Sequence, residues 1–108
     1  MTIHLRLRVA AARRDEFLAF LRDAVPFYER PGGIRVRLLR DERDPETYIE
    51  VIEYASRDAY ERDQQRVEHD LEMRARLQRW RALLEGPPVV EVYAEDERSV
   101  QPVVEGKS

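Results

Sequence analysis

Two segments in the first third of the chain carry basic side chains at every second position. The residues on this spacing are His4, Arg6, Arg8, Arg35 and Arg37. Because alternate side chains of a β-strand point to the same face, each set would lie on one side of a sheet. Guanidinium groups bind carboxylate or phenolate oxygens, and histidine exchanges protons near neutral pH. The spacing therefore indicates a surface that holds a small anionic or aromatic molecule.

Two later segments supply side chains that would complete this site. The further candidate substrate-binding residues are Tyr48, Glu50, Tyr54 and Glu91. The sequence does not decide which side of the sheet Tyr48, Glu50 and Tyr54 occupy, because both alternate sets of residues 48–54 mix apolar and polar side chains.

Three residues are candidates for proton transfer. His4 and Tyr93 are expected on the same face as the arginines, where either would take or guide a proton. His69 lies among acidic residues, and it is either a general base or a solvated histidine at a helix end. The two histidines share no short spacing and the chain has no cysteine, so we expect no metal site.

The hydrophobic pattern predicts two helical regions between four strands. Strands are expected over residues 2–9, 34–38, 48–54 and 89–94, and helices over 13–29 and 57–84. This βαββαβ order predicts a ferredoxin-like α+β fold, with a four-stranded antiparallel sheet and both helices on one face. The domain would cover residues 1–97. Residues 98–108 would form a C-terminal tail that either adds a short strand or is disordered.

The apolar spacing changes phase inside the second helical region. One stripe comprises Tyr60, Gln64, Val67 and Leu71, and a second comprises Met73, Leu77, Trp80 and Leu84. The two-residue offset between the stripes rotates the apolar face by roughly 200°. A single straight helix cannot bury both stripes in one core, so we expect a break near residues 69–72.

Composition argues against several classes of function. The 108 residues carry a net charge of −3, whereas a nucleic-acid-binding domain is expected to be basic. No apolar run approaches the ~20 residues that span a bilayer, so we expect no membrane insertion. The absence of cysteine excludes disulfides and thiolate catalysis, and it fits a cytoplasmic protein.

The sheet face that carries the basic residues is expected to be covered by a second copy of the chain. This face is too apolar for bare solvent and too charged for a dry core, and isologous pairing is the commonest way to cover such a surface. Two stacked sheets would enclose a cavity lined by arginine, glutamate, tyrosine and histidine. The alternative is a salt-bridge lattice between the sheets that holds no ligand.

The hairpin and its flanks resemble the antibiotic biosynthesis monooxygenase family of dimeric α+β barrels. The residues that carry the resemblance are Pro31-Gly32-Gly33-Ile34, Leu38-Leu39-Arg40-Asp41, Asp44-Pro45, and Tyr48 through Ser56 leading into Ala59 and Tyr60. The resemblance implies a homodimer, a dimeric barrel, and a family that includes cofactor-independent monooxygenases of phenolic polyketides, haem-degrading enzymes and quinol-modifying enzymes.

Some residues depart from the pattern of that family. Ile52 and Tyr54 occupy the positions of a frequent glutamate-x-tryptophan pair, and Asp63 aligns with a frequent histidine. The chain also contains no asparagine, a residue that this family associates with oxygen chemistry. These departures argue against haem degradation.

Three functions remain open. The first is a cofactor-independent monooxygenase-like homodimer that binds a small aromatic or anionic molecule, either between sheet and helices or between the sheets. The second is a non-catalytic ligand-binding or stress-related structural dimer of the same fold. The third is an isomerase or decarboxylase that uses an acid–base pair in place of oxygen.

Overall fold

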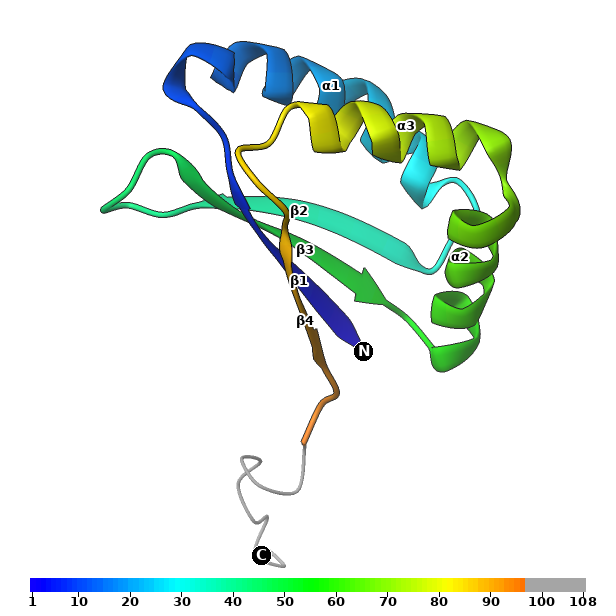
Figure 1. Ribbon diagram of the computed structural model, residues 1–108. Coiled ribbons are helices and arrows are strands. Elements are labelled where there is room, and N and C mark those ends of the chain that lie inside the picture. Colours follow the sequence, from blue (N-terminus) through cyan, green and yellow to red (C-terminus); the bar gives the residue numbers. More distant parts are fainter. Residues whose placement is uncertain (97–108) are drawn as a thin grey trace, which may run out of the picture.

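The computed structural model describes residues 1–96, and within them a four-stranded antiparallel sheet carries its helices on one face (Figure 1). The strands are β1 (Thr2–Arg8), β2 (Ile34–Arg40), β3 (Thr47–Tyr54) and β4 (Val89–Tyr93). The helices are the 3-10 turn η1 (Ala11–Arg13), α1 (Arg14–Glu29), α2 (Arg57–His69) and α3 (Leu71–Ala82). The strand order β2-β3-β1-β4 places β1 and β3 at the centre. The predicted ferredoxin-like fold is thereby confirmed. The tail at 98–108 lies outside the described residues.

Strand register decides which side of β3 meets the helices. Leu5 of β1 lies opposite Glu50 of β3, and Leu7 lies opposite Tyr48. Because directly paired residues share a face of the sheet, Tyr48, Glu50 and Tyr54 point toward the helices. Both Tyr48 and Glu50 are buried there. The opposite side of the sheet, here called the open face, carries the other set of β3 residues.

A tight glycine turn joins α1 to β2. Gly33 has a φ of +73°, a conformation that side chains with a Cβ rarely adopt. A Cβ at this position would also lie 3.2 Å from the Cβ of Ala59, which begins the buried side of α2. The turn therefore brings the first turn of α2 against the start of β2.

The predicted break in the second helical region lies at Asp70. This residue leaves the helical conformation, with φ of −88° and ψ of 120°, and its side chain accepts a 2.9 Å hydrogen bond from the backbone nitrogen of Met73. It therefore ends α2 and caps α3. Leu71, which we expected to continue the buried stripe of α2, is 80% exposed. That expectation was wrong because the break rotates Leu71 away from the sheet.

Two apolar clusters fill the space between the sheet and the helices. One surrounds Phe17 and Leu7 and includes Trp80, and the other joins Ile3 and Tyr54 to the start of α2. The edge strand β4 is less covered, with Val90 and Val92 more than half exposed although they share a face with Leu5 and Ile3. The space beneath the sheet is thus open on the β4 side. Among residues 1–96, no helix is long and apolar enough to cross a membrane.

Candidate functional site

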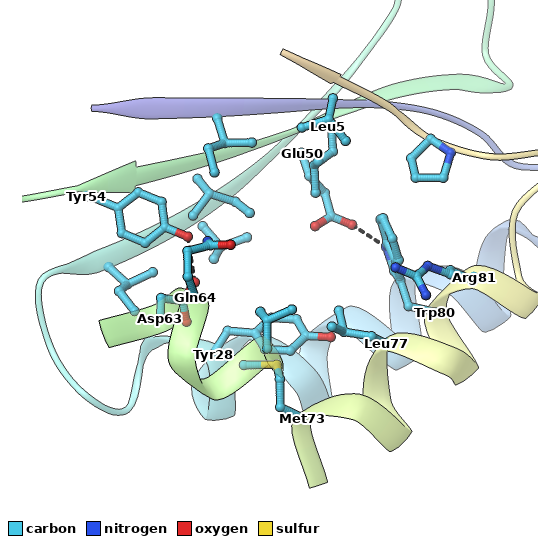
Figure 2. A pocket seen from close by; sticks show the side chains of 17 residues that line it. Leu5, Tyr28, Glu50, Tyr54, Asp63, Gln64, Met73, Leu77, Trp80 and Arg81 are labelled. Atoms are coloured by element: carbon cyan, nitrogen blue, oxygen red, sulfur yellow. Dashed lines mark hydrogen bonds between the residues drawn. The ribbon is translucent and has the colours of Figure 1, made fainter. Parts of the chain in front are cut away.

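A cavity of about 260 Å³ lies between the inner face of the sheet and the helices (Figure 2). Most of its wall is apolar, formed by side chains of β1, β2 and β3 above and of α2 and α3 below. The polar side chains in the wall are Tyr28, Glu50, Tyr54, Asp63, Gln64 and Arg81. An apolar cavity with a few convergent polar groups is the usual form of a small-molecule site.

Glu50 places a carboxyl group inside this cavity from the central strand β3. The residue is only 3% exposed, and its Oε1 accepts a 2.6 Å hydrogen bond from Nε1 of Trp80 on α3. Within the described chain, no arginine forms an ion pair with it. Burial away from water raises the pKa of Glu50 to about 7, although the Trp80 hydrogen bond favours the ionised form and partly opposes this rise. Glu50 can therefore both accept and release a proton at neutral pH.

Tyr28 enters the cavity from α1, on the helix side opposite Glu50 (Figure 2). Its hydroxyl is buried, and it is the one buried side-chain polar atom in residues 1–96 that has no hydrogen-bond partner. Burial raises the pKa of Tyr28, and the charge of Glu50 adds to the effect. The phenol therefore stays protonated and available as a hydrogen-bond donor.

Arg66 of α2 fixes the end of α1 that carries Tyr28. Its guanidinium donates to the backbone oxygens of Phe27 (2.8 Å) and Tyr28 (3.0 Å). These carbonyls belong to the last turn of α1, where the regular helical hydrogen bonds end, although the Phe27 oxygen also accepts a 3.3 Å bond from the Arg30 nitrogen. The same guanidinium lies 4.8 Å from the centre of the Phe27 ring. The position of Tyr28 thus depends on a contact between α1 and α2.

Asp63 and Tyr54 form a second polar pair in the cavity wall. The Tyr54 hydroxyl donates a 2.5 Å hydrogen bond to Asp63 Oδ2, while Arg66 lies 3.4 Å from Oδ1. Burial, reinforced by Asp63, raises the pKa of Tyr54. Each of these groups is already partnered, so the pair differs from the unpartnered Tyr28 hydroxyl.

Most of the site residues that the sequence predicted lie on the open face, on the opposite side of the sheet from this cavity. His4 packs against Tyr93 with ring centres 5.0 Å apart, and Glu91 lies opposite His4 in the strand register. Arg37 lies 3.5 Å from Glu53, and this same glutamate lies opposite Arg35. The structure therefore brings His4, Tyr93, Glu91 and the arginines together on one side, and it separates them from Glu50 and Tyr54.

The remaining candidates are Arg6 and Arg8, which also lie on the open face, Tyr48 in the core and His69 at a helix end. Arg8 forms ion pairs with Asp44 (2.8 Å) and Glu46 (3.1 Å) in the β2–β3 turn, and Arg6 is exposed between its neighbours on β3 and β4. Tyr48 packs against Phe17 in the core and accepts a hydrogen bond from Arg14. His69, at the end of α2, is exposed beside Glu68.

The sequence pattern predicted no role in a site for Tyr28, Asp63 or Trp80. Trp80 falls in a helix stripe typical of core packing, and the sequence does not show what lies opposite the polar atoms of Tyr28 and Trp80 in the fold. One signal for Glu50 was present in the sequence. The set Tyr48, Glu50, Ile52 and Tyr54 carries a single carboxylate among large, largely apolar side chains.

Comparison with known proteins agrees with this architecture. The model of the family named antibiotic biosynthesis monooxygenase matches residues 1–70. The chain belongs to this family. The resemblance inferred from the hairpin is thus confirmed. No curated protein matches this chain significantly.

Solved structures extend the similarity to the whole sheet. A candidate antibiotic biosynthesis monooxygenase from Bordetella bronchiseptica is 25% identical, with a TM-score of 0.61 over 87% of this chain and 94% of that chain. A mutant of SnoaB, a cofactor-independent oxygenase from Streptomyces nogalater, is 21% identical, with a TM-score of 0.67 over 87% and 92%. A conserved protein from Methanosarcina mazei is 10% identical, with a TM-score of 0.74 over 88% and 91%. At their low identities the last two establish the fold alone.

Residues 1–96 contain no group of three or more histidine or acidic side chains placed to hold a metal ion.

Proposed function

We propose that the protein is a cofactor-independent monooxygenase that acts on a small aromatic molecule in the cavity between sheet and helices. The observation that carries this proposal is Glu50, a carboxyl group without an ion-pair partner in an apolar cavity, with a pKa raised by burial to about 7. A general base is most effective when its pKa lies near the working pH. Family membership supports the reaction type.

The chemistry begins with removal of a proton from the substrate. The Glu50 carboxylate takes a proton from an acidic C–H or O–H group, which leaves an electron-rich carbanion or phenolate. That anion gives its electrons to dioxygen and a C–O bond forms. The resulting peroxide anion takes the proton back from Glu50 and becomes a hydroperoxide. Cleavage of the O–O bond releases water and leaves a carbonyl group on the product. One oxygen atom enters the product and the other enters water, so the substrate is the only reductant required.

Glu50 returns to its carboxylate form when it gives this proton to the peroxide. The residue also borders a second hollow of about 380 Å³ between α1 and β2, which is lined by Arg22 and Arg37 as well. Both arginines are exposed to solvent. We propose that Glu50 exchanges its proton with solvent through this hollow between turnovers.

The cavity itself indicates the size of the substrate. Its volume of about 260 Å³ exceeds the ~150 Å³ of an apolar cavity that binds benzene and lies just below the ~300 Å³ of common ligand pockets. A flat molecule of two or three fused rings suits this space, because the exposed edge at Val90 and Arg81 lets part of it protrude.

We further propose that the open face pairs with the same face of a second copy. The strand register places Leu39, Ile49, Arg6 and Val89 in one row across the sheet. Leu39 and Val89 are each about half exposed in the single chain. Such a row would bury apolar surface at a two-fold interface. In this arrangement His4, Tyr93 and the arginines belong to the contact between protomers.

Oxygen uptake with anthrone in air tests the enzymatic proposal. The wild-type protein is expected to accelerate uptake and anthraquinone formation above the rate without protein. Glu50→Gln keeps an acceptor for Trp80 but lacks a base, so it should reduce the rate ~10²–10⁴-fold. His4→Ala on the open face is the matched control and should retain activity. Binding of anthrone without accelerated uptake would instead favour the non-catalytic ligand-binding function.

A further inference from the structure

The hollow between α1 and β2, here called the α1–β2 hollow, has an apolar floor and a basic rim. Its volume of about 380 Å³ lies within the ~300–1,000 Å³ of common ligand pockets. One stripe of α1 and the helix-facing side of β2 supply the floor, which consists of Leu18, Leu21, Val25, Val36 and Leu38. All of these side chains except Leu21 are only half-buried, so they leave apolar surface that a ligand can cover.

Arg22 lies at the exposed rim of this hollow without an ion-pair partner. No acidic side chain of residues 1–96 lies within salt-bridge distance of its guanidinium. Its own helix offers none, because the positions three and four residues away hold Leu18, Ala19, Val25 and Pro26. The adjacent Asp23 pairs instead with Arg76 of α3 at 3.0 Å. The described chain therefore leaves the positive charge of Arg22 uncompensated.

The β2 side of the hollow adds a backbone N–H group. This strand is an edge of the sheet, so only one of its sides hydrogen-bonds to a neighbour. The nitrogen of Asp41, directly after β2, donates to the oxygen of Thr47, so the odd-numbered residues of β2 face β3. The residues between them point their N–H groups away from β3, and Leu38 is one of these. Among residues 1–96 no group accepts a hydrogen bond from the Leu38 nitrogen.

Glu29 provides an example of a carboxylate bound to this edge. Its Oε2 accepts a 2.8 Å hydrogen bond from the backbone nitrogen of Val36, two residues before Leu38. Both of these N–H groups point away from β3 on the same edge. The described chain thus supplies a carboxylate for Val36 and none for Leu38, which lines the hollow.

We propose that the α1–β2 hollow binds a small aliphatic monocarboxylate. The ligand carboxylate accepts hydrogen bonds from the Arg22 guanidinium and from the Leu38 N–H. The hydrocarbon chain of the ligand covers the half-buried leucine and valine side chains of the floor. This site is separate from the cavity proposed to hold the substrate, and the inference does not depend on the monooxygenase proposal.

The charges around the hollow favour an anion over a cation. Arg37 is the other cation of the wall, although it already lies 3.5 Å from Glu53. An ammonium group would meet both guanidinium groups at the rim, where like charges repel. Glu50 also lines the hollow, and its ionised form would repel a carboxylate. Because its pKa is about 7, Glu50 is largely protonated at about pH 6, and binding is best measured there.

An NMR titration of the isotope-labelled full-length chain at about pH 6 tests the proposal. The probes are hexanoate, hexan-1-ol and hexylamine, which share a hydrocarbon chain and differ in the head group. Hexanoate should shift the backbone amide signal of Leu38 downfield until the site is saturated. We expect hexan-1-ol to bind ~10-fold more weakly, because hydrogen bonds to a charged group are stronger than those between neutral groups. Hexylamine should bind more weakly than hexan-1-ol.

Three variants separate the site from general effects of charge. Arg22→Gln should lower the affinity for hexanoate ~3–5-fold, which is the upper range for an exposed ion pair, and leave that for hexan-1-ol unchanged. Arg43→Gln removes the same charge from the β2–β3 turn, away from the hollow, and should leave both affinities unchanged. Val25→Phe fills the floor and should abolish the Leu38 shift. The melting temperature of each variant confirms that it is folded.

Several outcomes would overturn this inference. They are the absence of a saturable shift at Leu38, equal affinities for hexanoate and hexan-1-ol, and equal losses in Arg22→Gln and Arg43→Gln. Slow hydrogen exchange of the Leu38 amide in the ligand-free protein would also overturn it, because another strand would then cover this edge. Binding of hexanoate that shifts Leu38 and depends on Arg22 supports the inference, whether or not the protein accelerates oxygen uptake with anthrone.

Discussion

Trp80 donates a 2.6 Å hydrogen bond from Nε1 to Oε1 of Glu50, and this contact joins α3 to the central strand β3. The bond holds a carboxyl group in place inside an apolar cavity. It also supplies the single hydrogen bond by which the described residues stabilise the ionised form of that group. A residue that packs in the core by its ring thus controls the acidity of the proposed base through its nitrogen.

Glu50 makes the stability of the folded protein depend on pH. Its pKa is about 7 in the folded state and 4.5 in the unfolded chain. Between these values the folded state holds one proton more, so the free energy of unfolding falls as pH rises, by about 3 kcal/mol in total. Urea unfolding from about pH 4 to about pH 8 should show this decline in the wild type and its absence in Glu50→Gln.

Other charged groups near the two cavities bear on that measurement. The titratable or charged residues that share a cavity wall with Glu50 are Tyr28, Tyr54, Asp63, Arg81, Arg22 and Arg37. The difference between wild type and Glu50→Gln removes contributions that do not depend on Glu50. Parallel pH curves for the two proteins would contradict the raised pKa.

Replacement of Trp80 by phenylalanine should make Glu50 a stronger base. The ring is largely retained, but the donor that favours the ionised carboxylate is lost. A hydrogen bond to a charged group contributes ~1.5–3 kcal/mol, so the pKa of Glu50 should rise by about one to two units. The carboxyl carbon chemical shift of Glu50, followed against pH by NMR, measures this. Met73→Leu changes the same cavity wall without touching the bond and should leave the midpoint in place.

Removal of the Tyr28 hydroxyl should stabilise the ligand-free protein. The group is buried without a partner, and a buried unsatisfied polar group costs ~1–3 kcal/mol. Tyr28→Phe should therefore raise the melting temperature by several degrees. Tyr54→Phe is the control, since it breaks the 2.5 Å bond to Asp63 and should lower the melting temperature. A lower melting temperature in both variants would mean that Tyr28 has a partner in solution.

Asp63 should contribute far more to stability than an exposed aspartate of the same helix. Asp63→Ala leaves the Tyr54 hydroxyl and the Arg66 guanidinium without their buried acceptor, and it should cost ~3 kcal/mol. Asp58 pairs with Arg62 on the exposed side of α2, so Asp58→Ala should cost less than ~1 kcal/mol. Chemical denaturation of the two variants gives the comparison. Equal losses would show that the buried network is not more stabilising than the surface pair.

Association through the open face can be tested by substituting one leucine on each side of the sheet. Leu39→Glu would place a charge in the proposed interface, and sedimentation velocity should show a shift from dimer to monomer. Leu71 is 80% exposed on the helix side, so Leu71→Glu should leave association unchanged. A monomeric wild-type protein, or equal effects of both changes, would reject this interface.

Local patterns in the sequence were sufficient to predict the elements of the fold. The alternation in β1 and β2, the glycines before Ile34 and the phase change at Asp70 each act over a few residues. Backbone geometry links such spacings directly to strands, turns and helix ends. The wrong prediction that Leu71 is buried also has a local cause. Leu71 follows the apolar spacing of α2 but lies beyond Asp70, the residue that ends this helix.

The candidate site needed the tertiary structure. The sequence named Glu50 and Tyr54 but grouped them with arginines that lie across the sheet, because the pattern of β3 is mixed on both sides. Only the pairing with β1 turned Glu50 toward the helices. The pKa of a carboxyl group depends on what surrounds it in space, and here Trp80 and the apolar wall come from segments far along the chain. The sequence alone therefore determined the architecture, and long-range packing decided where its chemistry lies.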